Sequence, residues 1–283
     1  MAVPLRIDDH RRDSAGFTYV YPVVSRRAGG VSIGINFNPN SACNWRCIYC
    51  QVPGLSRGAA PPLDHPRLRR ELKAMLDSIV HGDFYRRFQV PASHRRICDV
   101  AISGNGEPTT LKDFDAAIDT VLATLTDYPL PGLARVIISN GSRIHQPAVQ
   151  RGLGRWGRAG GVLWFKLDLA TRAGIAQVNQ IHLSPPQILE RLEQAAGLCP
   201  VWIQTCWFAL DGHPPPPQER QAYLELLAQA KRRGLPLEGV LLYGLARPSR
   251  QPQASRLSRL PAEILEELAA DIRRCGWPVR VTP

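Results

Sequence analysis

Long apolar runs are absent from this sequence of 283 residues, and their absence limits where the protein can reside. No stretch approaches the ~18 consecutive apolar residues that a membrane-spanning helix requires. The opening residues, MAVPLRIDDHRRDSAG, lack the apolar segment of a secretory signal. We therefore expect a cytoplasmic protein that neither spans a membrane nor enters the secretory pathway.

Lysine is scarce in this chain. Among 35 basic residues there are only four lysines, at positions 73, 112, 166 and 231, and the rest are arginines. The formal net charge of +11 fits an anionic partner such as RNA, because arginine is well suited to phosphate contacts. A GC-rich genome would produce the same ratio, so charge alone leaves nucleic-acid binding open.

Alternating strand and helix patterns occupy most of the chain. Apolar runs predict six core strands, at 31–37, 98–103, 135–139, 162–168, 201–209 and 239–243. Helical spacing predicts six helices, at 65–80, 112–126, 147–156, 186–196, 218–233 and 261–275. This alternation indicates an α/β fold with a parallel sheet. Residues 17–24, which include Pro22, predict an edge strand, and residues 279–281 a short last strand.

No internal repeat or long linker divides the sequence. The proline-rich stretch 211–217 is the one candidate hinge, and the strand–helix order continues across it. We predict a single domain over residues 1–283, with a polar arm at 1–16 and a core from residue 17 onward.

Three cysteines follow the first predicted core strand. Cys43, Cys47 and Cys50 have the spacing C-x-x-x-C-x-x-C, so they cannot all pair in disulfides. Three thiolates on one loop can reach a common centre, which suits an iron–sulfur cluster or zinc, although three unrelated core cysteines are an alternative. Three ligands leave a metal position open to a non-protein group. We expect the scattered remaining cysteines to be small buried side chains rather than ligands of a second cluster; they are Cys98, Cys199, Cys206 and Cys275.

The cysteine spacing, with the aromatic Tyr49 before the last cysteine, resembles the signature of the radical S-adenosylmethionine (SAM) superfamily. The resemblance implies a partial (β/α)6 TIM-type barrel. It implies that Cys43, Cys47 and Cys50 hold a [4Fe–4S] cluster and that SAM binds the fourth iron. It also places Tyr49 beside the bound cofactor.

A second motif, GNGEPT, ends the second predicted core strand. Its glycines allow close approach of a ligand to the backbone, and a carboxylate suits an ammonium group. In radical SAM proteins a motif of this shape binds the amino group of SAM. The resemblance therefore implies cofactor contacts from Gly104, Asn105, Gly106, Glu107 and Pro108, with Asn105 in place of a more common glycine. The alternative is an ordinary turn before a helix.

Polar residues also mark the ends of later strands. The SNG tripeptide after the third strand resembles one near the SAM ribose and carboxylate, which implies contacts from Ser139 and Asn140. Alternation places Gln204 and Tyr243 where polar groups can face the lumen, as further cofactor contacts.

The WFKLD strand places Lys166 and Asp168 on one face. A lysine and an aspartate inside a barrel are costly unless they pair or act chemically. They are therefore candidate catalytic residues or a simple ion pair at the strand mouth. Lys166 is the only lysine on a predicted core strand, where desolvation is expected to lower its pKa and make it a nucleophilic amine.

A longer resemblance covers roughly residues 20–260, through SRRAGGVSIGINFNPN, CNWRCIYCQ, ISGNGEPT, SNG, KLD and GLARPSRQPQASRLS. It is similar to the radical SAM Fe–S oxidoreductases related to tRNA wyosine synthase. It implies modification of a tRNA base, with pyruvate held on a lysine, and an external one-electron donor of the flavodoxin or ferredoxin type. Two features of relatives, a flavodoxin-like domain and a cysteine set ahead of Cys43, are not found in this sequence.

The sequence is compatible with three functions. The first is a tRNA-modifying radical SAM enzyme, and the second is a radical SAM enzyme acting on a small molecule or peptide. The third is a non-enzymatic iron–sulfur or zinc-binding protein. The GNGEPT motif with Glu107 argues against the third function, because an electron carrier has no use for a SAM site.

Overall fold

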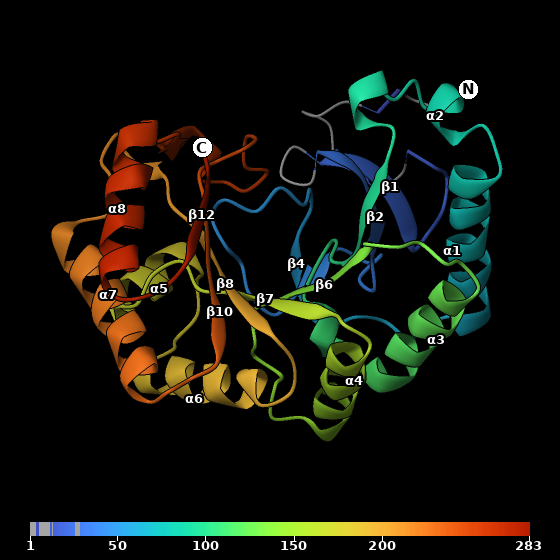
Figure 1. Ribbon diagram of the computed structural model, residues 1–283. Helices are drawn as coiled ribbons and strands as arrows, with labels where there is room; N and C mark the ends of the chain where they lie inside the picture. Colours follow the sequence, from blue (N-terminus) through green and yellow to red (C-terminus); the bar gives the residue numbers. More distant parts are fainter. Residues whose placement is uncertain (1–3, 6–11, 13, 26–28) are drawn as a thin grey trace.

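A curled, eight-stranded sheet runs through the middle of the protein (Figure 1). The computed structural model describes residues 4–5, 12, 14–25 and 29–283. The strand order is β1-β2-β5-β6-β7-β8-β10-β12, so each strand of the sheet lies beside the one that precedes it in the sequence. The sheet is open and its helices lie outside it, which is the arrangement of a partial TIM-type barrel, as the sequence predicted.

Each predicted core strand is present in this sheet. The strands are β1 (Val20–Ser25), β2 (Gly30–Ile35), β5 (Ile97–Ile102), β6 (Ala134–Ser139), β7 (Val162–Lys166), β8 (Val201–Cys206), β10 (Leu237–Tyr243) and β12 (Val279–Thr282). Neighbouring strands are parallel, except that β1 runs antiparallel to β2 at one edge. The predicted edge strand that contains Pro22 and the predicted last strand are both confirmed.

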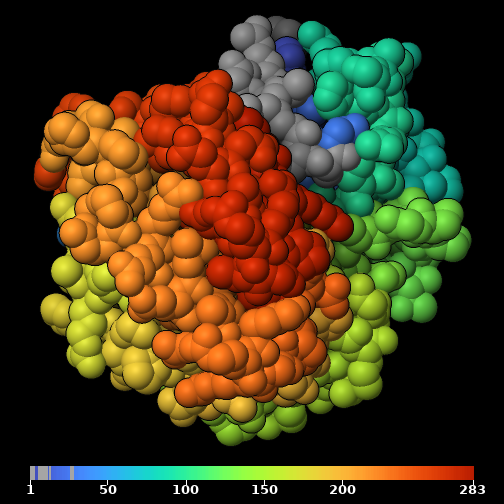
Figure 2. Space-filling view, turned by 60° about the vertical axis from the view of Figure 1, so that its left-hand side comes forward, coloured from blue at the N-terminus to red at the C-terminus, as the bar shows by residue number. Residues whose placement is uncertain are grey.

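The helices surround the sheet (Figure 1). They are α1 (His65–Val80), α2 (Phe84–Arg87), α3 (Phe114–Thr126), α4 (Pro147–Arg158), α5 (Arg172–Val178), α6 (Pro185–Ala196), α7 (Pro217–Arg232) and α8 (Ala262–Arg274), with 3-10 turns at Ala92–His94, Pro108–Thr110 and Ala254–Arg256. The six predicted helices are confirmed, whereas α2 and α5 were not predicted. In the space-filling view the chain from α7 to β12, coloured orange to red, forms one continuous surface (Figure 2).

Apolar side chains of the helices pack against the sheet to form the core. On α1, Leu68, Leu72 and Leu76 are fully buried, at the three- and four-residue spacing of one helix face. Val80, another apolar residue of this helix, is 41% exposed. It is the last residue of α1.

The amino-terminal arm predicted at residues 1–16 lies mostly outside the described residues. Within it, Leu5 is buried, and its N–H donates to the carbonyl of Phe88. That residue therefore packs against the body of the protein instead of extending as a polar arm. None of the described helices combines the length and the apolar character that crossing a bilayer requires.

The carboxyl ends of the parallel strands share one edge of the sheet, and the motifs follow them there. The cysteine loop follows β2, GNGEPT follows β5, SNG ends β6, and the KLD segment ends β7. Two short strands, β3 (Ala42–Cys43) and β4 (Ser56–Arg57), pair beside this edge. Another short pair joins β9 (Ala209–Leu210) to β11 (Leu257–Ser258). Ligands of α/β barrels bind at this edge, so the fold gathers the motifs where a site is expected.

Candidate functional site

The cysteine loop is the centre of the candidate site. Cys43 ends β3, Cys47 is buried, Cys50 is half-buried, and all three are free thiols. The N–H of Cys50 donates to the carbonyl of Cys47 at 3.0 Å, so a tight turn connects the last two cysteines. The sulfur of Cys43 accepts the N–H of Trp45 at 3.4 Å.

The chemistry of these thiols fits an iron–sulfur cluster. Burial raises the pKa of Cys43 and of Cys47 to about 12, and the Glu107 carboxylate adds to the shift at Cys43. Thiolates at such positions need the positive charge of a metal to form. Cys thiolates bind both zinc and four-iron clusters, and a cluster held by three cysteines leaves one iron open to another ligand.

Helix α5 supports one side of the cysteine loop. The N–H of Arg46 donates to the carbonyl of Asn179 at 3.2 Å, and the N–H of Ile48 donates to that of Val178 at 2.8 Å. Carbonyls at the end of a helix lack partners within the helix, and here they accept the loop. The Asn179 side chain also donates from Nδ2 to the Cys47 sulfur at 3.2 Å. The sequence did not predict α5 or this contact.

A segment near the end of the chain supports the other side. The Ser249 hydroxyl donates to the carbonyl of Ile48 at 2.7 Å, and the N–H of Arg250 donates to that of Cys50 at 2.9 Å. The Gln251 amide donates to the carbonyls of Val52 at 2.9 Å and Cys50 at 3.2 Å. The RPSRQ stretch, part of the longer resemblance, therefore holds the cysteine loop directly.

The GNGEPT turn packs against the beginning of the cysteine loop. A Cβ atom on Gly104 would lie 2.3 Å from Oδ1 of Asn36, and one on Gly106 would lie 1.9 Å from the carbonyl oxygen of Ala42. Only glycine permits this approach, and Gly104 also has a φ of +154°. The Asn36 side chain accepts the N–H of Asn105 at 3.0 Å. The turn and the cysteine loop are thus fitted to each other.

Glu107 joins the GNGEPT turn to the SNG turn. Its buried carboxylate accepts the Ser139 hydroxyl at 2.7 Å, the Asn140 N–H at 2.7 Å and the Thr109 hydroxyl at 2.6 Å. Burial raises the pKa of Glu107, and these hydrogen bonds oppose the shift. Glu107 also caps the 3-10 turn Pro108–Thr110.

Asn140 continues this network to the cysteine loop. Its side-chain amide donates to Oδ1 of Asn44 at 2.9 Å, and the Asn44 amide donates to the Ser142 hydroxyl at 2.6 Å. The structure therefore brings Glu107, Asn140 and the cysteine loop into one hydrogen-bonded assembly. Their contacts with SAM stay predictions.

Tyr49, Lys166 and Asp168 form a second polar cluster beside the cysteines. The Tyr49 hydroxyl donates to Oδ2 of Asp168 at 2.6 Å, and the Lys166 ammonium donates to the Tyr49 hydroxyl. The Lys166 Nζ lies 3.7 Å from Oδ2 of Asp168, whose Oδ1 accepts the N–H of Cys206 at 3.0 Å. Lys166 and Asp168 thus share a face, as alternation predicted, and they pair with each other.

The expected lowering of the Lys166 pKa is wrong. Burial alone would lower this pKa, but the carboxylate of Asp168 raises it well above its ordinary value. The buried ion pair keeps Lys166 as an ammonium group. Its role as a free amine nucleophile is therefore less favourable than the sequence indicated.

Gln204 and Tyr243 lie on the strands next to this cluster. Gln204 on β8 is buried and stands opposite Lys166 in the strand register. Tyr243 ends β10, opposite Cys206 on β8. That they face the lumen and contact a cofactor stays a prediction.

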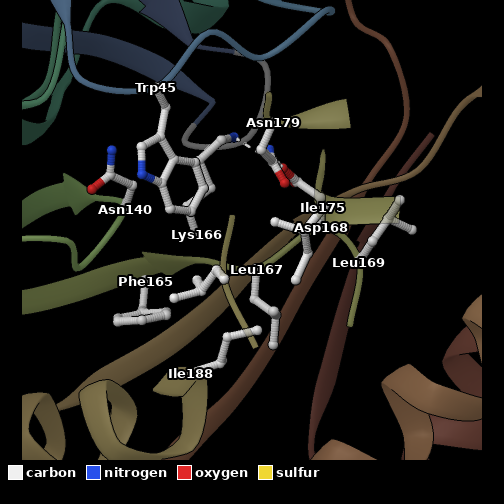
Figure 3. A pocket seen from close by; sticks show the side chains of 11 residues that line it. Trp45, Asn140, Phe165, Lys166, Leu167, Asp168, Leu169, Ile175, Asn179 and Ile188 are labelled. Atoms are coloured by element: carbon white, nitrogen blue, oxygen red, sulfur yellow. Dashed lines mark hydrogen bonds and ion pairs between the residues drawn. The ribbon is translucent and has the colours of Figure 1, made fainter. Parts of the chain in front are cut away.

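A small cavity connects the two polar clusters (Figure 3). Asn140, Lys166, Asp168 and Asn179 line it together with Trp45 and apolar side chains. Trp45 lies between Asn140 and Asn179 in this view. The cavity volume is about 10 Å³, close to the least that one water requires, about 10–15 Å³. The site residues are therefore closely packed around this small space.

The other cysteines occupy separate places in the fold. Cys98 is on β5, Cys199 precedes β8, Cys206 ends β8, and Cys275 follows α8. Among the described residues they form no three-ligand group that could hold a metal ion. Cys206 contacts the site through its backbone N–H, which donates to Asp168.

Comparison with known proteins now adds to this geometry. No protein-family model matches the chain. The UPF0026 protein of Helicobacter pylori strain 26695 is 29% identical over 160 residues, which are 56% of this chain and 45% of that protein. The chain thus spans less than half the length of this relative.

Solved structures match over most of the chain. A radical SAM methyltransferase from Sphaerobacter thermophilus has a TM-score of 0.57 at 14% identity, with 93% of this chain and 68% of that chain covered. The chain has the radical SAM fold. Coproporphyrinogen III oxidase from Escherichia coli, a radical SAM enzyme, has a TM-score of 0.53 at 17% identity, covering 87% of this chain and 52% of that chain. The predicted partial barrel is confirmed, and the radical SAM resemblance is supported at the level of the fold.

The radical SAM fold also accounts for where the motifs lie. The cysteine loop leaves the first parallel strand, and the GNGEPT and SNG turns leave the next two. Spore photoproduct lyase with bound AdoMet shares the fold, with a TM-score of 0.56 at 10% identity over 88% of this chain and 75% of that chain. At sequence identities of 10–17%, these structures show the fold of this chain.

Proposed function

We propose that this protein is a radical SAM enzyme in which Cys43, Cys47 and Cys50 hold a [4Fe–4S] cluster. With an electron from an external donor, such a cluster would supply the reductive cleavage of SAM to methionine and a 5′-deoxyadenosyl radical, which abstracts hydrogen from a substrate. The observation that supports this most strongly is a loop of three free cysteines supported on both sides and packed against a glycine turn. A reducing cytoplasm and a donor of the flavodoxin or ferredoxin type complete the proposal.

The protein's own residues would bind SAM and exclude water. Oε1 of Glu107 accepts hydrogen bonds from Thr109 and Ser139, whereas Oε2 accepts the N–H of Asn140. A carboxylate has about four acceptor positions, so Oε2 retains capacity for the ammonium group of SAM. The closely packed interior around Lys166 and Asp168 would protect a radical from solvent.

The remaining SAM contacts follow from position. The backbone of Gly104, Asn105 and Gly106 lies next to the cysteine loop, and Asn140 reaches that loop through Asn44. Gln204, Tyr243 and Tyr49 would border the cofactor from the strands and the loop.

For the substrate, we propose a tRNA base, with modification of the wyosine type. The longer sequence resemblance and the net charge of +11 support this proposal. The raised pKa of Lys166 argues against the lysine–pyruvate step of that reaction. A small molecule or peptide is the alternative substrate. Binding of bulk tRNA, with an affinity that decreases as the salt concentration rises, would favour the tRNA proposal over this alternative.

Formation of 5′-deoxyadenosine tests the proposed activity. The protein is reconstituted with iron and sulfide without oxygen, reduced with dithionite and supplied with SAM. We expect methionine and 5′-deoxyadenosine from the wild type, and neither product from Cys47→Ala. A wild-type protein with a complete cluster that leaves SAM intact would contradict the proposal, as would a protein that takes up stoichiometric zinc and no iron.

A further inference from the structure

We propose that Asn179 is a positioning residue that sets the reduction potential of the cluster through its hydrogen bond to Cys47. The inference rests on the proposed function, because it requires a cluster on the cysteine loop. Asn179 follows α5 and is buried. Its Nδ2 lies 3.2 Å from the Cys47 sulfur and 2.9 Å from Oδ2 of Asp168.

The two contacts of Asn179 determine which way its amide faces. A metal-bound Cys47 thiolate and the Asp168 carboxylate are both acceptors, so the NH₂ group and not the amide oxygen must face them. An amide NH₂ has two hydrogens, and one is available for each acceptor. Asn179 therefore donates to a cluster ligand and to a buried carboxylate at the same time.

The backbone holds Asn179 in place. Its N–H donates to the carbonyl of Ile175 at 2.8 Å, and its carbonyl accepts the N–H of Arg46 at 3.2 Å. The side chain thus approaches Cys47 from a residue that is itself bonded to the cysteine loop. The hydrogen bond to the sulfur does not depend on a mobile side chain reaching across a gap.

The negative charge of the neighbouring Asp168 affects the reduction potential in the opposite direction to the hydrogen bond from Asn179 to Cys47. Cluster reduction takes one electron from the external donor and makes the cluster more negative by one charge. A negative carboxylate nearby opposes that change, whereas an N–H pointing at the sulfur favours it. Asn179 stands between Cys47 and Asp168 and donates to both, so it favours the reduced state and raises the reduction potential.

The test replaces Asn179 and measures the potential of the reconstituted cluster without SAM. In Asn179→Leu and Asn179→Ala the donor is lost. We expect the ratio of reduced to oxidised cluster at a fixed potential to fall about tenfold, which is a decrease of about 59 mV for a one-electron couple. Gln177→Leu is the matched control, because Gln177 is an exposed amide on the same helix. Its potential should equal that of the wild type.

The outcomes separate this inference from the proposed function. A wild type that forms no cluster contradicts the proposed function. A wild type with a cluster, and Asn179 variants with equal iron content and an unchanged potential, contradict only the role of Asn179.

If both variants fail to retain iron, the hydrogen bond from Asn179 is tested in the wild-type protein instead. The protein is made with heavy nitrogen in asparagine side-chain amides, and pulsed electron paramagnetic resonance of the reduced cluster is recorded. The side-chain amide of Asn44 donates to the Ser142 hydroxyl, and that of Asn140 donates to Oδ1 of Asn44. We expect a coupling to the labelled nitrogen, and its absence overturns the inference.

Discussion

Glu107 and Asn140 are joined by a 2.7 Å hydrogen bond from the Asn140 N–H to Oε2, although 33 positions separate them in the sequence. A second bond of 2.7 Å runs from the Ser139 hydroxyl to Oε1. The GNGEPT and SNG turns are therefore one structural unit. A change at Glu107 affects both turns and the cofactor contacts proposed for them.

Replacement of Glu107 by glutamine should weaken SAM binding. A charge-assisted hydrogen bond contributes roughly 1.5–3 kcal/mol, so we expect SAM affinity to fall about tenfold or more. Calorimetry on the cluster-loaded protein measures this change, with Glu190→Gln on the exposed face of α6 as the control. Unchanged affinity in Glu107→Gln, with its cluster intact, would show that the turn is only structural.

Gly106→Ala should destabilise the protein. The new Cβ would lie 1.9 Å from the carbonyl oxygen of Ala42, so β3 would have to move. Overpacking of this kind costs about 1–3 kcal/mol in the free energy of unfolding, which urea denaturation measures. Gly154→Ala is the control, because its nearest neighbour is a flexible Arg158 nitrogen at 3.5 Å. Equal stability of the Gly106 and Gly154 variants would contradict the close approach.

The late segment should control how firmly the cysteine loop holds iron. Ser249→Ala removes the hydroxyl that donates to the carbonyl of Ile48, and Gln251→Leu removes the amide that donates to the carbonyls of Cys50 and Val52. Each buried hydrogen bond contributes about 1 kcal/mol. We expect faster loss of iron to a chelator in both variants.

The exposed Ser255 provides a control for this experiment, as Ser255→Ala. Its rate of iron loss should match the wild type. If Ser249→Ala and Gln251→Leu also match the wild type, the segment does not stabilise the loop.

The wyosine-type proposal predicts that pyruvate and borohydride form an adduct on Lys166. Although burial would lower the pKa of Lys166, the Asp168 carboxylate raises it well above the ordinary lysine value. The amine therefore stays protonated at a pH where a free lysine would already have lost its proton. We therefore expect the adduct yield, measured by mass spectrometry, to increase with pH. Lys166→Arg should abolish it, because arginine keeps the charge but cannot form an imine. If no adduct forms at any pH while SAM is cleaved normally, the result contradicts the wyosine-type proposal but not the radical SAM activity.

Local patterns in the sequence predicted the regular elements well. Helix α1 was predicted at 65–80 and observed at His65–Val80, because Asp64 caps it and its apolar stripe is long. Helix α5 was missed because it has only seven residues, Arg172–Val178, which is too short for a clear helical period. The Asn179 contact was missed with it.

Contacts between distant segments were beyond the reach of sequence spacing. Ser249 and Ile48 are separated by 201 positions, and nothing local in either segment predicts their hydrogen bond. The Lys166 pKa was wrong for a similar reason. Desolvation follows from an apolar strand, whereas the opposing effect depends on how close Asp168 lies in the folded protein.

Mössbauer spectroscopy on protein reconstituted with isotopically enriched iron tests the central claim most directly. If Cys43, Cys47 and Cys50 hold a cubane with one open iron, the wild type should contain about four irons, and SAM should change the signal of one of them. Cys47→Ala should hold no such cluster. Four irons that do not respond to SAM, or a site filled by zinc alone, would contradict the claim.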